Sequence, residues 1–172
     1  MADAQIIDVI SFMPERIVAN DTKSSADGAP EGGDAVSNHA FFEGVSERRY
    51  ASPDYSSSDL GVRAIEALCA RTQLDPIDID CIVYSCMFND SFWPGIGSQV
   101  QSRVGAPRAT ILQIDTSCCS WLSALETARS FIESGRFKNI VVLTVTNFIS
   151  RLPEFQRSKR SNVLGDGATA TL

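Results

Sequence analysis

The sequence lacks the cysteine pattern of a disulfide framework or a zinc site. Its five cysteines are an odd number, and no two of them have the C-x-x-C spacing of many metal sites. Basic residues are also in the minority, because 15 Lys and Arg against 21 Asp and Glu leave a net charge of −6. Such a balance argues against the clustered basic face of a nucleic-acid-binding protein. We therefore expect no metal and no nucleic-acid partner, and we expect a reducing cytoplasmic environment.

Long apolar runs and a targeting segment are missing as well. The longest apolar runs, such as 140–145, have the length of a strand and are too short to span a membrane. The first residues, Met-Ala-Asp-Ala, lack the basic start and long apolar core of a signal peptide. Of the 172 residues, 44 % are hydrophobic, which is ordinary for a globular protein. We therefore expect a single globular domain over residues 1–172, without membrane contact.

Apolar periodicity predicts alternating strands and helices along most of the chain. Short runs of β-branched and aromatic residues indicate strands, and apolar residues three or four positions apart indicate helices. Between Asn20 and Asn38 the composition is mainly Asp, Ser, Gly, Ala and Pro, so we predict a mobile loop at about 21–37. The expected strands are 6–12, 80–86, 110–114, 139–145 and 168–172, and the expected helices are 58–69, 94–104 and 117–134.

Capping residues mark the expected helix boundaries. Ser58 with Asp59 can cap the first helix, and Pro94 can open the second. Gly105 and Gly135 stand where a residue with positive φ ends a helix. The alternation of strands and helices predicts an α/β fold, in which parallel strands are joined by right-handed crossovers.

The segment with the clearest chemistry is Gln-Ile-Asp-Thr-Ser-Cys-Cys-Ser-Trp at 113–121, which joins a predicted strand to a predicted helix. A thiol at this junction lies at the positive end of the helix dipole, close to backbone N–H groups that have no partner within the helix. Both features favour the thiolate, which is the nucleophilic form of cysteine. Hydrolases use a similar strand–turn–helix nucleophile. The structural alternative is that two small thiols pack the start of the helix.

This segment resembles the active-site helix of β-ketoacyl-acyl-carrier-protein synthase III. The similarity runs from Cys118-Cys-Ser-Trp through Leu-Ser-Ala-Leu-Glu-Thr-Ala to Phe-Ile-Glu-Ser-Gly135. Further motifs follow in the family order and cover nearly the whole chain outside the 21–37 loop. They are Met13-Pro-Glu, Gly44-Val-Ser-Glu-Arg48, Gln99-Val-Gln-Ser-Arg-Val-Gly105 and Leu164-Gly-Asp-Gly167, whose Gly165 and Gly167 are expected to permit positive φ at a structural turn. The stretch 149–155 resembles the alkylquinolone-forming branch of specialised metabolism.

The resemblance implies the N-terminal half of a thiolase-like fold, with a five-stranded mixed sheet and helices on both faces. It also implies an acyltransferase of fatty acid or polyketide biosynthesis, with no bound cofactor and with acyl-CoA or acyl-ACP as substrate. Counting back from Ser134-Gly135 without a gap places the family nucleophile at Cys118 and makes Cys119 a neighbour that lines the turn. Cys119 remains an alternative nucleophile, because the start of a helix is hard to place from sequence.

The family's His and Asn lie in a C-terminal half that these 172 residues do not include. The single histidine, His39, lies at the edge of the predicted loop and matches no family motif. We therefore expect a partner half, as a separate subunit, a cleaved fragment or the remainder of a longer chain, and a dimer of complete units. The helix at 117–134 agrees with this, because Ala124 and Phe131 lie off its main apolar stripe and require cover from a second side. That stripe consists of Trp121, Leu122, Leu125, Ala128 and Ile132.

Two departures from the family bear on the substrate. Phe42 occupies the position of the family's arginine contact to the nucleotide end of coenzyme A, which argues against that route of recognition. Trp93 falls where the family closes the neighbour's acyl pocket across the dimer axis, and an indole there would shorten the acyl chain; the alternative is that it anchors its own loop.

A basic loop can meet an acidic carrier protein or phosphate groups, or can simply be solvated. Its residues are Arg151, Arg157, Lys159 and Arg160.

Three functions are consistent with these patterns. In the first, Cys118 accepts an acyl group and passes it on by Claisen condensation or to an oxygen or nitrogen acceptor. In the second, the chain is a non-catalytic assembly subunit of a heteromeric thiolase-fold complex. In the third, it is a free-standing thiol hydrolase, which would need His39 within hydrogen-bond reach of Cys118.

Overall fold

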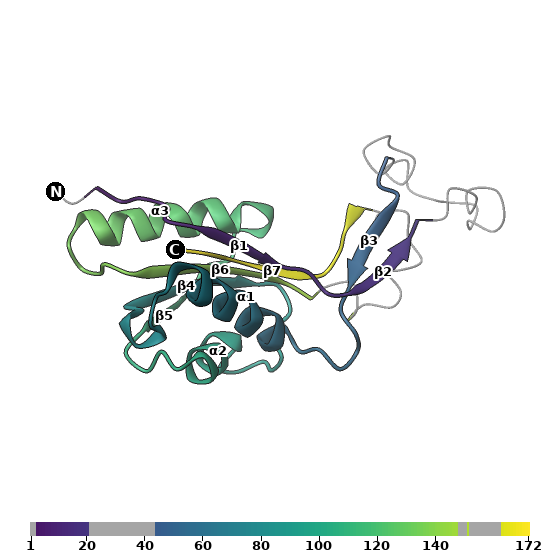
Figure 1. Ribbon diagram of the computed structural model, residues 1–172, viewed down its shortest axis with the longest axis horizontal. Coiled ribbons are helices and arrows are strands. Elements are labelled where there is room, and N and C mark those ends of the chain that lie inside the picture. The colour runs from purple at the N-terminus through teal and green to yellow at the C-terminus, as the bar shows by residue number, and fades with distance from the viewer. Residues whose placement is uncertain (1–2, 21–43, 148–150, 152–162) are drawn as a thin grey trace.

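The computed structural model describes residues 3–20, 44–147, 151 and 163–172, which contain one five-stranded mixed sheet. Figure 1 shows this sheet as the middle layer, with helix α3 (Ser120–Glu133) on one face and helices α1 (Ser57–Thr72) and α2 (Ile96–Val104) on the other. The three strands at one side are parallel, and β7 runs antiparallel to both of its neighbours. In spatial order the strands are β1 (Val9–Phe12), β7 (Gly167–Thr171), β6 (Ile140–Thr146), β4 (Cys81–Cys86) and β5 (Thr110–Gln113). The expected α/β class and mixed sheet are confirmed.

Two crossovers place helices on opposite faces of the sheet. The chain passes from β4 through α2 (Ile96–Val104) to β5, and then through α3 (Ser120–Glu133) back past β4 to β6. Because the second step runs in the opposite direction along the sheet, two right-handed crossovers must use opposite faces. Helix α1 (Ser57–Thr72) packs beside α2, and short 3₁₀ turns occupy Pro76–Asp78 (η3) and Ser117–Cys119 (η4). No described helix combines the length and the hydropathy that crossing a bilayer requires.

The hydrophobic core is thick on the α1 and α2 face and thin on the α3 face. Leu60, Ile65, Ile82 and Leu143 are fully buried in the larger cluster. On the other face, the buried side chains under α3 are small or β-branched, and Leu122 of α3 is 62 % exposed. Those buried residues are Cys81, Val83, Ala124, Ala128, Ile140 and Val142. Helix α3 therefore contacts the sheet through a narrow strip of small residues, and its larger apolar side chains are only partly buried, with Leu122 exposed.

The N-terminus of α1 differs from the sequence expectation. The N-cap is Ser56, not Ser58, and the Ser56 hydroxyl accepts a hydrogen bond from the Asp59 backbone N–H at 3.1 Å. The Asp59 carboxylate in turn accepts the Ser56 N–H at 2.7 Å, which completes a capping box. Burial raises the pKa of Asp59, whereas hydrogen bonds from Ser56 and Arg103 lower it. The net effect is a pKa below the ordinary value. Sequence reasoning identified Asp59 as a capping residue but missed Ser56, and it placed the N-cap two residues late, at Ser58.

The second helix, in contrast, begins later than expected. Gly95, with φ of 82°, is the N-cap of α2, so Pro94 precedes the helix and does not open it. At the other ends, Gly105 and Gly135 have φ of 78° and 73°, which confirms both as the expected left-handed helix ends. The predicted helix 117–134 divides into the 3₁₀ turn η4 and helix α3, which ends at Glu133.

A two-stranded antiparallel hairpin, which the sequence did not predict, stands beside the main sheet in Figure 1. It pairs β2 (Arg16–Ala19) with β3 (Glu47–Tyr50), and most of its side chains are at least partly exposed. Short polar strands without a buried face carry little periodic signal, which explains the omission. The predicted mobile loop at 21–37 lies outside the described residues.

Candidate active site

Cys118 and Cys119 lie in η4, at the point where the chain leaves the sheet and enters α3. The preceding strand stays in the sheet up to Ile114, whose backbone N–H donates to the Tyr84 carbonyl at 2.8 Å. Ser117 then adopts a left-handed conformation with φ of 53°, which is uncommon for a residue with a side chain. The sequence prediction of a thiol at a strand–turn–helix junction is therefore confirmed for both cysteines.

Several hydrogen bonds between residues close in sequence hold the turn before α3. The Asp115 carboxylate accepts the Ser117 backbone N–H at 3.0 Å, and the Thr116 carbonyl accepts the Cys119 N–H at 3.2 Å. The Thr116 hydroxyl contacts the Ser123 hydroxyl at 2.9 Å. Among the described residues, no backbone acceptor pairs with the N–H of Cys118. This donor at the start of a helix is available to an external oxygen atom.

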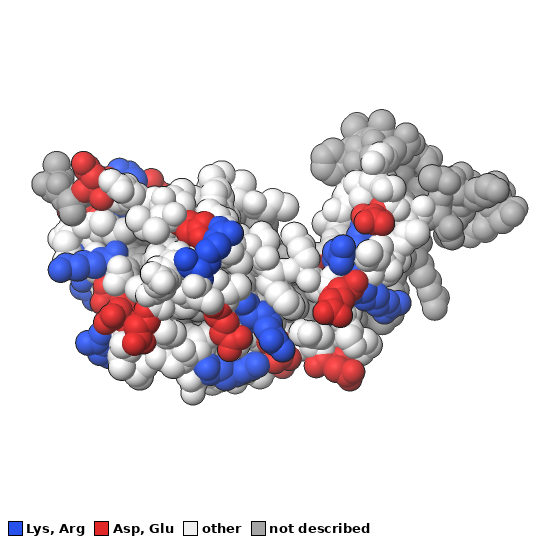
Figure 2. All heavy atoms as spheres, viewed as in Figure 1, with Lys and Arg blue, Asp and Glu red and all other residues white. Residues whose placement is uncertain are grey.

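Burial separates the five cysteines into two groups. Cys69, Cys81 and Cys86 are buried, and desolvation raises the pKa of all three thiols, to about 11 for Cys81 and for Cys86. These three therefore stay protonated at neutral pH and are poor nucleophiles. Cys118 and Cys119 are exposed. In Figure 2 the surface near the N-terminal end of α3 is largely uncharged.

The first turn of α3 is anchored to the sheet by a side chain of β7. The Trp121 indole N–H donates to the Thr171 hydroxyl at 3.2 Å, and both residues are largely shielded by the packing around them. Ala124 and Ala128 face the sheet, although sequence reasoning placed Ala124 off the main apolar stripe and Leu122 on it. The small alanine side chains allow a close approach of α3 to β4 and β6. Leu122 is 62 % exposed and lines a hollow beside the sheet, so Ala124, and not Leu122, belongs to the buried part of the stripe.

Two hollows lie on the α3 face of the sheet, and only one of them is lined by residues of α3. One has a volume of ≈ 380 Å³ and lies between the N-terminal segment and α3, where Ile6, Leu122 and Leu125 contribute apolar walls. The other, of ≈ 410 Å³, lies between β3 and the sheet and is lined in part by Thr144 and Thr169. Neither hollow has Cys118 or Cys119 among its described lining residues. Within the described part of this chain, the two thiols therefore lie on an open surface.

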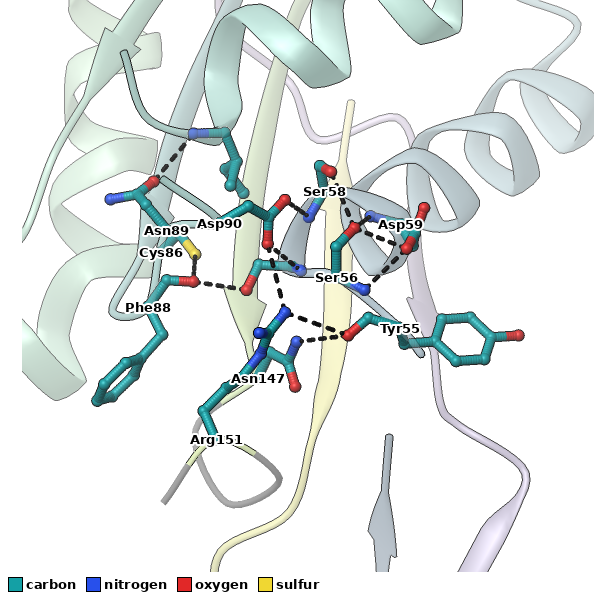
Figure 3. Close-up of polar contacts among 12 residues, drawn as sticks. Tyr55, Ser56, Ser58, Asp59, Cys86, Phe88, Asn89, Asp90, Asn147 and Arg151 are labelled. Carbon is teal, nitrogen blue, oxygen red and sulfur yellow. Dashed lines mark hydrogen bonds and ion pairs between the residues drawn. The ribbon is translucent and has the colours of Figure 1, made fainter. Parts of the chain in front are cut away.

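Trp93 lies at an exposed tip of the loop between β4 and α2. Its exposed fraction is 83 %, and that of Phe92 is 103 %. Such exposure does not agree with the alternative in which Trp93 anchors its own loop. The base of the loop is firmly held, because the Asp90 carboxylate accepts the backbone N–H groups of Ser57 at 2.6 Å and Ser58 at 2.9 Å. Figure 3 shows this contact at the N-terminal end of α1.

Arg151 is the only residue of the predicted basic loop within the described part of the chain. Its guanidinium lies 3.9 Å from the Asp90 carboxylate and donates to the Tyr55 carbonyl at 3.5 Å. The Asn147 amide donates to the same carbonyl at 3.1 Å, as Figure 3 shows. Arg151 therefore faces the loop that carries Trp93, while 43 % of its side chain remains exposed. The remaining residues discussed from the sequence, Arg157, Lys159, Arg160, Phe42 and His39, lie outside the described residues.

The turn at Gly165 and Gly167 is structural, but for a different reason from the one expected. Neither glycine has a positive φ. A Cβ at Gly165 would lie 3.0 Å from the Arg49 carbonyl, and one at Gly167 would lie 3.0 Å from the Phe12 carbonyl, so a side chain at either position would force the neighbouring backbone to shift by a few tenths of an ångström. The intervening Asp166 is buried, and its carboxylate accepts the Ala51 N–H at 2.9 Å.

Sequence reasoning missed two residues that organise this end of the sheet. Asp90 joins the loop before α2 to the start of α1, and Ser120 lies beneath the turn that carries the two cysteines. Both are polar residues near the start of a helix, which is a weak signal for capping. Their partners lie in other segments or in an irregular turn, so the sequence alone could not identify them.

Comparison with known proteins points to one family. Residues 112–172 match the model of 3-oxoacyl-[acyl-carrier-protein (ACP)] synthase III. A β-ketoacyl-[acyl-carrier-protein] synthase III from Clostridium acetobutylicum is 30 % identical over 172 residues, which are 100 % of this chain and 51 % of that protein.

Solved structures give the same result. A 3-oxoacyl-(acyl-carrier protein) synthase from Burkholderia xenovorans LB400 is 26 % identical with a TM-score of 0.82, over 99 % of this chain and 48 % of that one. The priming β-ketosynthase from the R1128 polyketide biosynthetic pathway is 25 % identical with a TM-score of 0.77, over 97 % and 48 % of the two chains. The chain thus spans about half the length of the relatives it matches.

Proposed function

We propose that this chain supplies the nucleophile of an acyltransferase, on the premise that it resembles, in sequence and in fold, the N-terminal half of a 3-oxoacyl-[acyl-carrier-protein] synthase III-like protein of the thiolase fold. The nucleophile is Cys118, which accepts an acyl group as a thioester. The donor is an acyl-CoA or an acyl carrier protein, because the relatives are named as synthases that act with acyl carrier protein.

The observation that carries this proposal is the position of an exposed thiol beside an unused backbone donor. Cys118 is exposed in η4 directly before α3, and its own N–H has no backbone acceptor in the described part of the chain. The N-terminus of a helix carries partial positive charge that favours an anion nearby. The same end of the helix can therefore stabilise both the attacking sulfur and the oxygen that becomes negative during the attack.

The proposed reaction has two steps, acylation of Cys118 and transfer of the acyl group to the acceptor. The Cys118 sulfur attacks the carbonyl carbon of the donor thioester, and the carbonyl oxygen becomes an oxyanion. When the carbonyl re-forms, the bond to the donor sulfur breaks and the donor leaves as a thiolate that takes up a proton. A carbanion, or an oxygen or nitrogen acceptor that gives up its proton to a base of the C-terminal half or to water, then attacks the acyl group, and the bond to Cys118 breaks so that its thiolate is regenerated.

The second half of the site comes from a C-terminal thiolase-like half that carries the His and the Asn. The described residues of this chain contain no histidine that could serve as a base near Cys118. Helix α3 also leaves Leu122 62 % exposed beside an apolar hollow, which supports a partner that covers this face. Two such complete units would form the dimer.

Three further assignments complete the proposed site. Cys119 lines the turn beside the nucleophile. Trp93 closes an acyl pocket and restricts the length of the acyl chain. Its loop is exposed at the tip and is held at its base by Asp90. The basic loop with Arg151, Arg157, Lys159 and Arg160 contacts the acidic carrier protein or the phosphate of the donor. Arg151 supports this last assignment, because part of its guanidinium remains accessible although it contacts Asp90 and Tyr55.

Mass spectrometry of the acyl-enzyme tests the proposal directly. The chain is incubated, together with its C-terminal half, with acyl-CoA or with acyl carrier protein, and the peptide that spans 109–129 is fragmented. We expect the acyl mass on Cys118, its disappearance in Cys118→Ala and its persistence on Cys118 in Cys119→Ala. Acyl mass on Cys119 would assign the nucleophile to the neighbouring residue. No acyl mass on either cysteine would refute the proposal.

The second candidate is a non-catalytic assembly subunit that completes a partner's fold. The uncovered apolar surface of α3 favours it, because this surface requires a partner whether or not the thiol reacts. The Cys118→Ala variant separates the two functions. A scaffold would keep both the assembly and the activity of the complex, whereas an acyltransferase would keep only the assembly.

A further inference from the structure

Ser120 is a buried hydroxyl directly beneath the turn that carries Cys118. Its exposed fraction is 4 %, and its Oγ lies between two backbone groups of the turn. The hydroxyl donates to the Ser117 carbonyl at 2.8 Å and accepts the Thr116 backbone N–H at 2.9 Å. The Ser120 side chain thus holds backbone groups on both sides of the Ser117 nitrogen and α-carbon, which are the atoms that adopt the left-handed conformation.

These bonds oppose the intrinsic preference of the turn. A residue with a side chain has a higher free energy in the left-handed region, because its Cβ crowds the following carbonyl oxygen. Ser117 has no glycine-like freedom, yet its φ is 53°. The Asp115 carboxylate holds one side through the Ser117 N–H, and Ser120 holds the other through the Ser117 carbonyl. Because Ser120 is buried, water does not replace its two bonds easily.

The position of Cys118 follows from the position of its neighbours. Ser117 is fixed by Asp115 and Ser120, and Cys119 is fixed by the hydrogen bond from its N–H to the Thr116 carbonyl at 3.2 Å. Relaxation of Ser117 to the ordinary right-handed region would rotate the next peptide group, and with it the direction of the Cys118 N–H and side chain. A change of about 1 Å in the position of a reacting group can reduce a rate about 100-fold.

We propose that Ser120 is a positioning residue, whose buried hydroxyl holds Ser117 in the left-handed conformation and thereby aims the Cys118 thiol and N–H at the acyl donor. This inference rests on the proposed function of Cys118 as the acyl acceptor. Ser120 touches neither the donor nor the reacting sulfur, and it acts through the two backbone groups that it joins. A residue that only stabilised the start of α3 would change the melting temperature without changing the reactivity of Cys118.

The test compares two variants of the same shape at this site. Ser120→Thr keeps the hydroxyl, whereas Ser120→Val replaces it with a methyl group, so steric effects are matched and only the hydrogen bonds differ. Ser120→Ala also removes the hydroxyl, without adding volume, and it replaces Ser120→Val in the test if the valine variant does not fold. Ser130→Ala is the control on the same helix, because the exposed Ser130 hydroxyl donates only to the Glu126 carbonyl of α3.

Two rates are measured on the assembled protein with its C-terminal half. The first is the acylation of Cys118 by the thioester donor, and the second is the alkylation of Cys118 by iodoacetamide as a function of pH, both resolved by fragmentation. We expect Ser120→Val and Ser120→Ala to acylate Cys118 at least about tenfold more slowly than Ser120→Thr, with a shifted pH profile of alkylation. We expect Ser130→Ala to match the wild type in both rates.

The outcomes separate the two proposals. If the wild type acylates Cys118 and the valine, alanine and threonine variants do so at equal rates, the positioning role is refuted and the acyltransferase stands. If the wild type never acylates Cys118, the acyltransferase fails, and the alkylation profiles alone then decide whether Ser120 positions the thiol. A loss of rate that parallels a loss of folded protein in thermal melts, without a changed pH profile, also refutes the positioning role.

Discussion

Several carboxylates of this protein accept hydrogen bonds from backbone N–H groups, either within a turn or from a distant segment. Asp115 does so before η4, Asp166 does so beside β7, and Asp80 does so at the start of β6. Their residue type could be predicted from sequence, because Asp is common in turns. Their partners could not, since the Ala51 N–H bound by Asp166 lies 115 residues away in the chain. Single residues thus signal a turn locally, whereas the identity of the second group depends on the fold.

Asp80 allows a test of this point through pH. Its carboxylate accepts the N–H groups of Asn139 and Lys138, both at 2.9 Å, and the bond from Asn139 is the main reason why its pKa lies below the ordinary value of 3.8. A carboxylate with a lowered pKa in the folded state stabilises the fold above its unfolded pKa, and this contribution is lost as the pH falls through the folded pKa.

We therefore expect Asp80→Asn to reduce the free energy of unfolding at pH 7 by about 1 kcal/mol or less, since the group is largely solvated. The difference from the wild type should shrink as the pH falls below 3.8. Urea denaturation at pH 7 and near pH 3 measures both values. Asp3→Asn, at an exposed terminal position, is the charge-matched control. An equal deficit at both pH values would contradict the explanation.

At the scale of helices and loops, the ends of elements were harder to predict than their centres. The centres of α1, α2 and α3 follow from apolar periodicity, and the left-handed ends at Gly105 and Gly135 follow from the residue type. The N-termini of α1 and α2 were displaced by two residues, because Ser56 and Gly95 take the cap positions that Ser58 and Pro94 were expected to mark. Several residues near each start can cap a helix, and tertiary contacts select among them.

At the start of α1, the tertiary contact is made by Asp90. It provides acceptors for two N–H groups at the start of α1 and thereby joins this helix to the loop that carries Trp93. Asp90→Asn keeps one side-chain acceptor and loses the negative charge at the helix N-terminus. We expect the free energy of unfolding to fall by about 1 kcal/mol. Urea denaturation measures the change, and Glu66→Gln, on the exposed face of α1, is the control. A stability equal to that of the control would show that the contact is dispensable.

For the whole molecule, the two faces of the sheet differ in how completely they are covered. Helices α1 and α2 bury one face, whereas α3 alone covers part of the other and leaves Leu122 62 % exposed. The outer side of α3 also carries a network in which Arg129 pairs with Glu126 at 2.5 Å and Glu133 at 2.8 Å. An apolar strip next to such a charged rim is typical of a surface that a partner covers.

Leu122→Asp tests whether α3 contacts the C-terminal half. Because Leu122 is exposed in this chain, the substitution should leave the chain folded, as circular dichroism can verify. We expect it to weaken association with the C-terminal half at least about tenfold, which corresponds to about 1.4 kcal/mol of binding free energy. Ile77→Asp, at an apolar residue that is 45 % exposed in η3, is the matched control. Sedimentation of the mixed halves measures association, and equal binding by both variants would place the partner elsewhere.

The sequence by itself determined the α/β class, the strands and helices of the main sheet and the junction at which Cys118 and Cys119 lie. These features depend on residues that are close together in the chain, where apolar periodicity and capping act locally. The resemblance of the motifs around Cys118 to one enzyme family added the proposed chemistry, and it did so through spacing within short segments.

Only the tertiary structure decided which atoms meet across long separations. It paired β2 with β3, turned Ala124 and not Leu122 towards the sheet, and placed the Ser120 hydroxyl between the Thr116 N–H and the Ser117 carbonyl. The physical reason is that each of these depends on burial against a distant strand or on an irregular backbone turn. Neither burial nor a left-handed φ at a serine is encoded in a local pattern, so both emerge only when the sheet and its helices pack together.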